Sequence, residues 1–273
     1  MENLFVGARI ARSLVAVVLA ALVLAPTAAT PTPVPVPLEQ VVEPLEPDVA
    51  AALRVLRVSV TDVTTGRIIC GGSAVPIRCE RSGDGSSWEI VAITARHVVD
   101  PNGPMRAVGG RVSLDIFDAP ALGGPVSAAQ AEVQSIEFAG GPSAVDFGSS
   151  QDIALLRARS PVSVPVVSLA PSLGPVRAGQ SVVVSGFPFC EELHVQRAIV
   201  SSLAVLPHVG EYWHVSSVAV GGMSGGAVLD SLGRMVAIIT NADPRAAGIM
   251  YALPIAALRS ELESAGMVPH SRR

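Results

Sequence analysis

Residues 221–228 read Gly-Gly-Met-Ser-Gly-Gly-Ala-Val, and this stretch decides how the rest of the chain is interpreted. Ser224 lies in a glycine-rich turn, and the apolar residues 226–229 that follow predict a short strand. Glycines allow backbone N–H groups to point at one spot, where they stabilise a negative charge that develops on oxygen. The stretch therefore predicts a serine held at the end of a strand beside an anion-stabilising turn.

Two further segments supply the groups that such a serine needs. Residues 93–99, ITARHVV, predict a strand that ends near His97, and residues 151–156, QDIALL, place Asp152 directly before an apolar strand. A serine hydroxyl is a weak nucleophile until an imidazole takes its proton. Histidine suits this role because its unperturbed pKa is ~6.5, and a carboxylate on the other ring nitrogen fixes the tautomer.

Each segment alone also fits an ordinary structural role. A histidine after a strand is usually a surface or core residue, an aspartate before a strand is usually a turn residue, and glycine-rich serine turns are common loops. Asp146 competes with Asp152, but no apolar strand follows it. The order His97, Asp152, Ser224 in one β-rich chain favours the catalytic interpretation.

The pattern of apolar and turn-forming residues from residue 52 onward predicts an all-β fold. Short apolar runs separated by Gly, Pro, Ser and Asp indicate strands in a barrel or sandwich. These runs are residues 55–63, 73–77, 88–94, 111–117, 153–156, 181–185, 198–206, 213–220, 226–229 and 235–240. These ten runs approach the twelve strands that two six-stranded barrels require, and an apolar stripe predicts one helix at residues 254–265.

Composition excludes several classes of function. Hydrophobic residues make up 49% and charged residues 15% of the chain, which predicts a globular protein. The net charge of −4 does not indicate the basic surface that nucleic-acid binding requires. All 19 basic residues are Arg, which excludes lysine Schiff bases and Walker loops. The remaining histidines lack metal-ligand spacing, so we expect neither a metal nor a cofactor; they are His194, His208, His214 and His270.

The first 51 residues predict export followed by a linker. Residues 1–29 combine Arg9 and Arg12 with an apolar run at residues 14–25, which is shorter than the ~20 residues of a spanning helix. We expect a secreted or periplasmic (cell-envelope) protein, with an uncleaved membrane anchor as the alternative. Residues 30–51 are proline-rich and predict an extended linker. Barrels are then expected at residues 52–170 and 171–273, the second with the terminal helix.

The three segments resemble the signature blocks of the trypsin-like (chymotrypsin-fold) serine peptidases. Residues 70–75, CGGSAV, are similar to the strand that these enzymes place before the histidine block. The resemblance implies two six-stranded antiparallel barrels with the active site in the cleft between them. It implies that His97 is the general base, that Asp152 orients it, and that Ser224 attacks. The N–H groups of Gly222 and Ser224 would form the oxyanion hole.

The chain departs from the animal digestive enzymes. Residues 235–242 and 251–254 resemble the bacterial HtrA/DegP-like branch more closely, and we expect no PDZ domain. Met223 replaces the usual Asp, and no Ile-Val-Gly-Gly segment is present to supply an activating amine. Val98 replaces the usual Cys after the histidine, so the expected partner of Cys70 is Cys79, which leaves Cys190 unpaired.

Further residues are expected to bind substrate because of the same resemblance. Val218 and Ala219 would line a pocket for small or medium apolar side chains. The strand formed by Ile239, Thr240 and Asn241 would pair with the substrate backbone.

Two alternatives to a secreted serine endopeptidase acting on polypeptides remain. Residues 222–226 also fit the G-x-S-x-G elbow of α/β-hydrolases, but that fold needs its acid and histidine after the serine, where only His270 follows. The second alternative is a catalytically inactive exported binding module on the same scaffold.

Overall fold

The computed structural model describes most of the chain from residue 45 onward. The described residues are 45–100, 110–117, 127–138, 152–170, 176–206, 210–218, 220–242, 248–258 and 262–263. The chain divides into two compact units, residues 1–43 and residues 44–273, and only the second contains described residues. Among those residues, no helix combines the length and apolar character needed to cross a membrane. The predicted export segment lies outside them.

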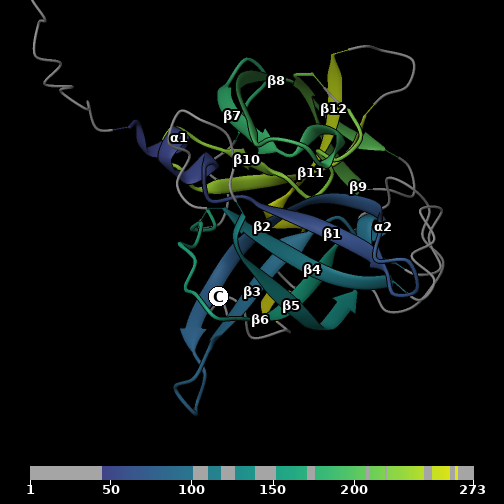
Figure 1. Ribbon diagram of the computed structural model, residues 1–273. Helices are drawn as coiled ribbons and strands as arrows, with labels where there is room; N and C mark the ends of the chain where they lie inside the picture. The colour runs from purple at the N-terminus through teal and green to yellow at the C-terminus, as the bar shows by residue number, and fades with distance from the viewer. Residues whose placement is uncertain are drawn as a thin grey trace, which may run out of the picture. The chain divides into compact units, whose positions relative to one another are not determined.

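Residues 56–160 and 181–254 form two closed antiparallel barrels of six strands each, which confirms the predicted fold class (Figure 1). The first barrel has the strand order β1-β2-β3-β6-β5-β4. Its strands are β1 (Leu56–Asp62), β2 (Ile68–Arg81), β3 (Trp88–Thr94), β4 (Gly110–Phe117), β5 (Ser127–Phe138) and β6 (Ala154–Ser160). The second has the order β10-β11-β12-β9-β8-β7. Its strands are β7 (Ser181–Gly186), β8 (His194–Leu206), β9 (Gly210–Ser216), β10 (Ala227–Leu229), β11 (Met235–Ala242) and β12 (Ile249–Pro254).

Aliphatic side chains make up most of the interior of both barrels, in keeping with an aromatic content of only 4%, although the second barrel also buries Trp213. The interior of the first barrel packs residues such as Val58, Leu114 and Leu156, and that of the second packs residues such as Val184 and Val228. A third buried cluster joins the barrels, because it combines side chains from β3 and β6 with side chains from β7, β10 and β11. The segments that carry His97, Asp152 and Ser224 adjoin this cluster.

Two strands and the helices differ from the sequence prediction. β5 was not predicted, because polar residues interrupt its apolar alternation. β12 occupies residues 249–254, so the predicted helix at 254–265 begins too early: Pro254 ends a strand. A 3₁₀ turn η2 (Ile255–Leu258) follows, and only Leu262 and Glu263 are described as helical beyond it. A short helix α1 (Pro47–Ala52) occupies the end of the predicted linker, with proline at its favoured first position.

The predicted Cys70–Cys79 disulfide is wrong. Cys79 is a free thiol, and both cysteines belong to the single strand β2. Cys70 pairs with Val60 of β1, whereas Cys79 pairs with Ile90 of β3. Nine residues of extended strand span roughly 30 Å, whereas disulfide-bonded Cα atoms lie within about 7 Å of each other. Cys190 is also a free thiol.

Candidate active site

Strand pairing brings His97 and Asp152 together. β3 ends at Thr94, which pairs with Ala154 at the start of β6. The chain then turns into the short helix α2 (Arg96–Val99), which carries His97, while Asp152 lies two residues before β6. Because the two strands are antiparallel, the end of one lies beside the beginning of the other. His97 and Asp152, 55 positions apart in the chain, thereby meet at one end of the first barrel.

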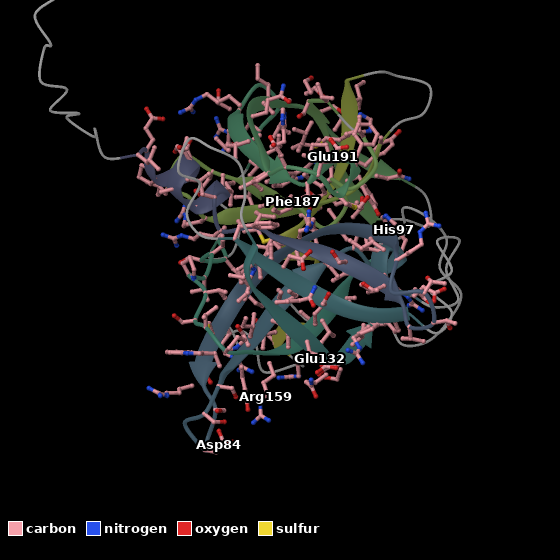
Figure 2. All side chains as sticks on the ribbon, in the orientation of Figure 1. Asp84, His97, Glu132, Arg159, Phe187 and Glu191 are labelled. Carbon is pink, nitrogen blue, oxygen red and sulfur yellow. The ribbon has the colours of Figure 1, made fainter. Side chains whose placement is uncertain are left out.

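The Asp152 carboxylate holds His97 by three hydrogen bonds. Oδ2 lies 2.8 Å and Oδ1 3.1 Å from His97 Nδ1, and Oδ1 also accepts the His97 backbone N–H at 3.0 Å. The Asp152 side chain is fully buried, and His97 is 7% exposed. An ionised carboxylate can only accept hydrogen bonds, so Nδ1 carries the proton and Nε2 presents its lone pair. Figure 2 labels His97 on the helical turn α2.

Backbone geometry positions Ser224. Gly222 and Gly225 flank it with φ values of +94° and +85°, which glycine adopts without strain. A Cβ at Gly225 would clash with the Ser73 carbonyl and with the Thr94 hydroxyl. The Ser224 hydroxyl donates to the Thr240 carbonyl at 3.1 Å. The glycines are therefore required by space as well as by conformation.

The turn that carries Ser224 lies close to the segment that carries His97, with one part of β2 between them. The Ser73 N–H donates to the Ser224 carbonyl at 2.8 Å. A Cβ at Gly72 would lie 2.8 Å from both γ-carbons of Val98 and 2.9 Å from the Ser224 carbonyl, so this part of β2 is sandwiched between the two segments. The structure thus brings the His97, Asp152 and Ser224 segments into one site.

The predicted oxyanion donors, Gly222 and Ser224, lie in a turn whose peptide planes are fixed. The Gly221 carbonyl accepts the Phe189 N–H at 2.6 Å, and the Gly222 carbonyl accepts the Ser73 hydroxyl at 2.8 Å. Within the described part of the chain, the N–H groups of Gly222 and Ser224 donate to no backbone carbonyl. Both donors remain available to an incoming oxygen.

The predicted substrate-binding residues are placed unevenly. Val218 is exposed, and Ala219 lies outside the described residues, as does the rival acid Asp146. Ile239 does not fit a role in pairing with substrate: its N–H donates to the Gly226 carbonyl, its carbonyl accepts the Gly225 N–H, and its side chain is buried.

The other two residues of the predicted pairing strand follow Ile239 on β11. Beyond its pairing with β10, this strand continues through Thr240 and Asn241, whose side-chain oxygen accepts the Ala242 N–H.

Sequence reasoning missed two residues that support the site. The Ser73 hydroxyl, within the block CGGSAV, accepts the Phe187 N–H at 2.9 Å and donates to Gly222. Burial raises the pKa of Tyr212, the nearby Asp152 charge raises it further, and a hydrogen bond with Thr240 opposes the shift. The Tyr212 phenol therefore stays neutral beside Asp152. No local pattern marks a tyrosine of β9 for this place, because only barrel closure brings it there.

No group of three or more His, Cys, Asp or Glu side chains within the described residues is arranged to hold a metal ion. The chemistry available from the described residues is that of an oriented imidazole, a serine hydroxyl and backbone N–H donors.

Two closed barrels with this site at their junction define the serine peptidases of the chymotrypsin fold. A family model described as a trypsin-like peptidase domain matches residues 81–238, a range that includes His97, Asp152 and Ser224. The chain therefore belongs to the trypsin-like peptidase family.

Solved structures share this fold at low sequence identity. A serine endoprotease from Yersinia pestis is 19% identical, with a TM-score of 0.55 over 84% of this chain and 69% of that one. Rv3671c from M. tuberculosis H37Rv, solved as an inactive serine-to-alanine mutant, is 18% identical, with a TM-score of 0.55 over 83% and 94%. The HtrA-type protease AlgW, solved with a tripeptide, is 20% identical, with a TM-score of 0.53 over 83% and 64%. No curated protein sequence matches the chain.

Proposed function

We propose that this protein is a secreted serine endopeptidase that hydrolyses peptide bonds through Ser224, His97 and Asp152. The main support for the proposal is the hydrogen bonding of the Asp152 carboxylate to His97 Nδ1, next to the segment that holds Ser224; this contact is called the clamp below. The clamp selects the tautomer in which Nε2 can accept a proton. Secretion is supported by residues 1–29, which combine a positive start with a short apolar run.

The reaction proceeds in two halves. Ser224 Oγ attacks the carbonyl carbon of the scissile peptide bond while its proton passes to His97 Nε2, and Asp152 stabilises the resulting imidazolium. The negative charge on the substrate oxygen is met by the N–H groups of Gly222 and Ser224. Collapse of this intermediate breaks the C–N bond, and the leaving amine takes the proton from His97. A water molecule then hydrolyses the acyl-enzyme by the same path in reverse.

The proposed substrate is a polypeptide with a small or medium apolar residue before the cleaved bond. Val218, on the predicted pocket, carries no charge that could pair with Arg or Lys. Thr240 and Asn241 extend β11 beyond its pairing with β10 and offer backbone for an added substrate strand.

Removal of the nucleophile tests the proposal. Ser224→Ala should lower kcat by about 10⁶-fold, because the triad acts as a unit, while the far-UV spectrum and Tm stay unchanged. Ser216→Ala, at an exposed position on β9, is the matched control. A fluorophosphonate should form one adduct on the wild type and on Ser216→Ala, and none on Ser224→Ala. A well-folded wild type that neither cleaves peptides nor takes the label would instead be the inactive binding module.

A further inference from the structure

The turn at residues 187–191, which contains η1 (Pro188–Cys190), has an unfavourable backbone conformation. It lies directly against residues 221–224, the turn that carries the predicted oxyanion donors and is called the oxyanion turn below. Phe189 and Cys190 have φ values of +53° and +60°, and both are non-glycine residues. Such residues persist in the left-handed region only when the surrounding structure over-determines them, and they cluster at functional sites. A Cβ at Gly222 would lie 2.8 Å from the Phe189 nitrogen and 2.9 Å from the Cys190 nitrogen.

This turn determines the direction of one oxyanion donor. The Phe189 N–H donates to the Gly221 carbonyl at 2.6 Å. In a planar trans peptide the carbonyl and the following N–H point in opposite directions. The bond from Phe189 therefore points the Gly222 N–H away from the turn. If the turn moved, that peptide plane would be free to rotate and the donor would be lost.

Arg57, on β1 of the first barrel, holds the turn in place. Its NH1 group donates to the Cys190 carbonyl at 3.0 Å and to the Glu191 carbonyl at 3.4 Å. Its guanidinium also lies 5.0 Å from the ring centroid of Phe117, whose ring lies 5.3 Å from that of Phe187 at an interplanar angle of 31°. Figure 2 labels Phe187 and Glu191 at the two ends of the turn. Arg57 thus contacts both the backbone of the turn and the aromatic pair beneath it.

A buried carboxylate fixes Arg57 in this position. Arg57 Nε donates to Asp115 Oδ2 at 2.8 Å, and the Asp115 side chain is only 6% exposed. The Ser59 hydroxyl and the Gln130 amide donate to the same carboxylate at 2.6 and 2.8 Å. With its carboxylate satisfied by three groups, Asp115 fixes the arginine, and the planar guanidinium can bind acid and carbonyls at the same time.

We propose that Arg57 is a positioning residue, which orders the oxyanion hole through the turn at residues 187–191. This inference rests on the proposed peptidase function. Met223 carries no charge to anchor the oxyanion turn, so a contact from the first barrel performs that task. Arg57 also borders a surface groove of about 720 Å³ with Phe189, Glu191 and Glu192, so the test must distinguish positioning from direct contact with substrate.

The experiment compares Arg57→Gln and Arg57→Lys with the matched control Arg159→Gln, whose arginine forms an exposed pair with Asp84 (both labelled in Figure 2). Fluorophosphonate titration of the full chain counts the competent sites, and kcat is expressed per titrated site. We expect kcat per site to fall about 10- to 100-fold in Arg57→Gln, with KM within about twofold of the wild-type value. Arg57→Lys should recover part of the loss, and Arg159→Gln should match the wild type.

Three results would overturn the inference. A wild-type kcat per titrated site in Arg57→Gln would show that the arginine only supports folding. A raised KM with unchanged kcat would show that it contacts substrate directly. If Arg57→Gln does not fold, the Arg57→Lys variant is the test. Full activity of Arg57→Lys with an unchanged KM would show that a positive charge at this position is sufficient and that the hydrogen-bond geometry of arginine is not needed. An inactive wild type would instead refute the proposed function.

Discussion

The two barrels contribute to the site by different physical means. The first supplies side-chain charge: Asp152, fully buried, accepts three hydrogen bonds from His97. The second supplies backbone shape: Ser224 lies between two glycines with positive φ, and its neighbours contribute N–H groups rather than side chains. Replacing the carboxylate of Asp152 should therefore remove the first barrel's contribution to catalysis. Adding a methyl group to a glycine beside Ser224 should remove the contribution of the second barrel.

The interface between the barrels follows the same division. Ser73 and Arg57, both on strands of the first barrel, extend side chains that bind backbone carbonyls of the second. In these two polar contacts the second barrel contributes backbone atoms, the carbonyls of Gly222 and Cys190. The conformation of its turns is therefore set in part by residues more than a hundred positions away.

Among the changes that compare the two barrels, the largest effect is expected when the first barrel loses the charge of Asp152. In Asp152→Asn, the carbonyl of the new amide would accept the His97 backbone N–H, leaving its NH₂ group facing Nδ1. Nδ1 would then become an acceptor and Nε2 would carry the proton, which is the wrong tautomer for a base. We expect kcat to fall about 10⁴-fold, measured with a peptide substrate.

Asp230→Asn is the control for the loss of a buried carboxylate, because Asp230 pairs with Arg234 in a turn of the second barrel. It should lower Tm and leave kcat unchanged. A loss of less than tenfold in Asp152→Asn would show that the acid of the site lies elsewhere.

A methyl group on the oxyanion turn tests the contribution of the second barrel. A Cβ at Gly222 would clash with the Phe187 carbonyl, and its φ is +94°, whereas a Cβ at the neighbouring Gly221 meets nothing within 4 Å. Gly222→Ala should therefore displace the donor and lower kcat about 10²- to 10³-fold. Gly221→Ala should stay within about twofold of the wild type. Equal losses in the two variants would contradict the backbone explanation.

The smallest expected effect concerns disulfides. Cys79 and Cys190 are free thiols, and burial raises the pKa of the Cys190 thiol, which leaves less of the reactive thiolate. We expect dithiothreitol to change Tm by less than about 1 °C in a calorimetric scan. Loss of a native disulfide typically costs about 2–5 kcal/mol, which at about 2–4 °C per kcal/mol would lower Tm by at least about 4 °C. A decrease of that size would show that the protein contains a stabilising disulfide after all.

The sequence by itself determined the fold class and the three segments that carry His97, Asp152 and Ser224. Alternation of apolar residues is local, and so is the need for glycine around a sharp turn, so both can be recognised without knowing which strands pair. β3 was predicted with its exact bounds for this reason, whereas β5, with polar residues at several positions, was missed.

Only the tertiary structure decided which distant groups meet. The pairing of Thr94 with Ala154 carries His97 to Asp152, barrel closure brings Tyr212 near Asp152, and β2 keeps Cys70 and Cys79 apart. Arg57 carries no local mark that distinguishes it from the other arginines of the chain. Its role arises from hydrogen bonds to Cys190 and Glu191, more than 130 residues away, and such contacts form only when two closed barrels pack together.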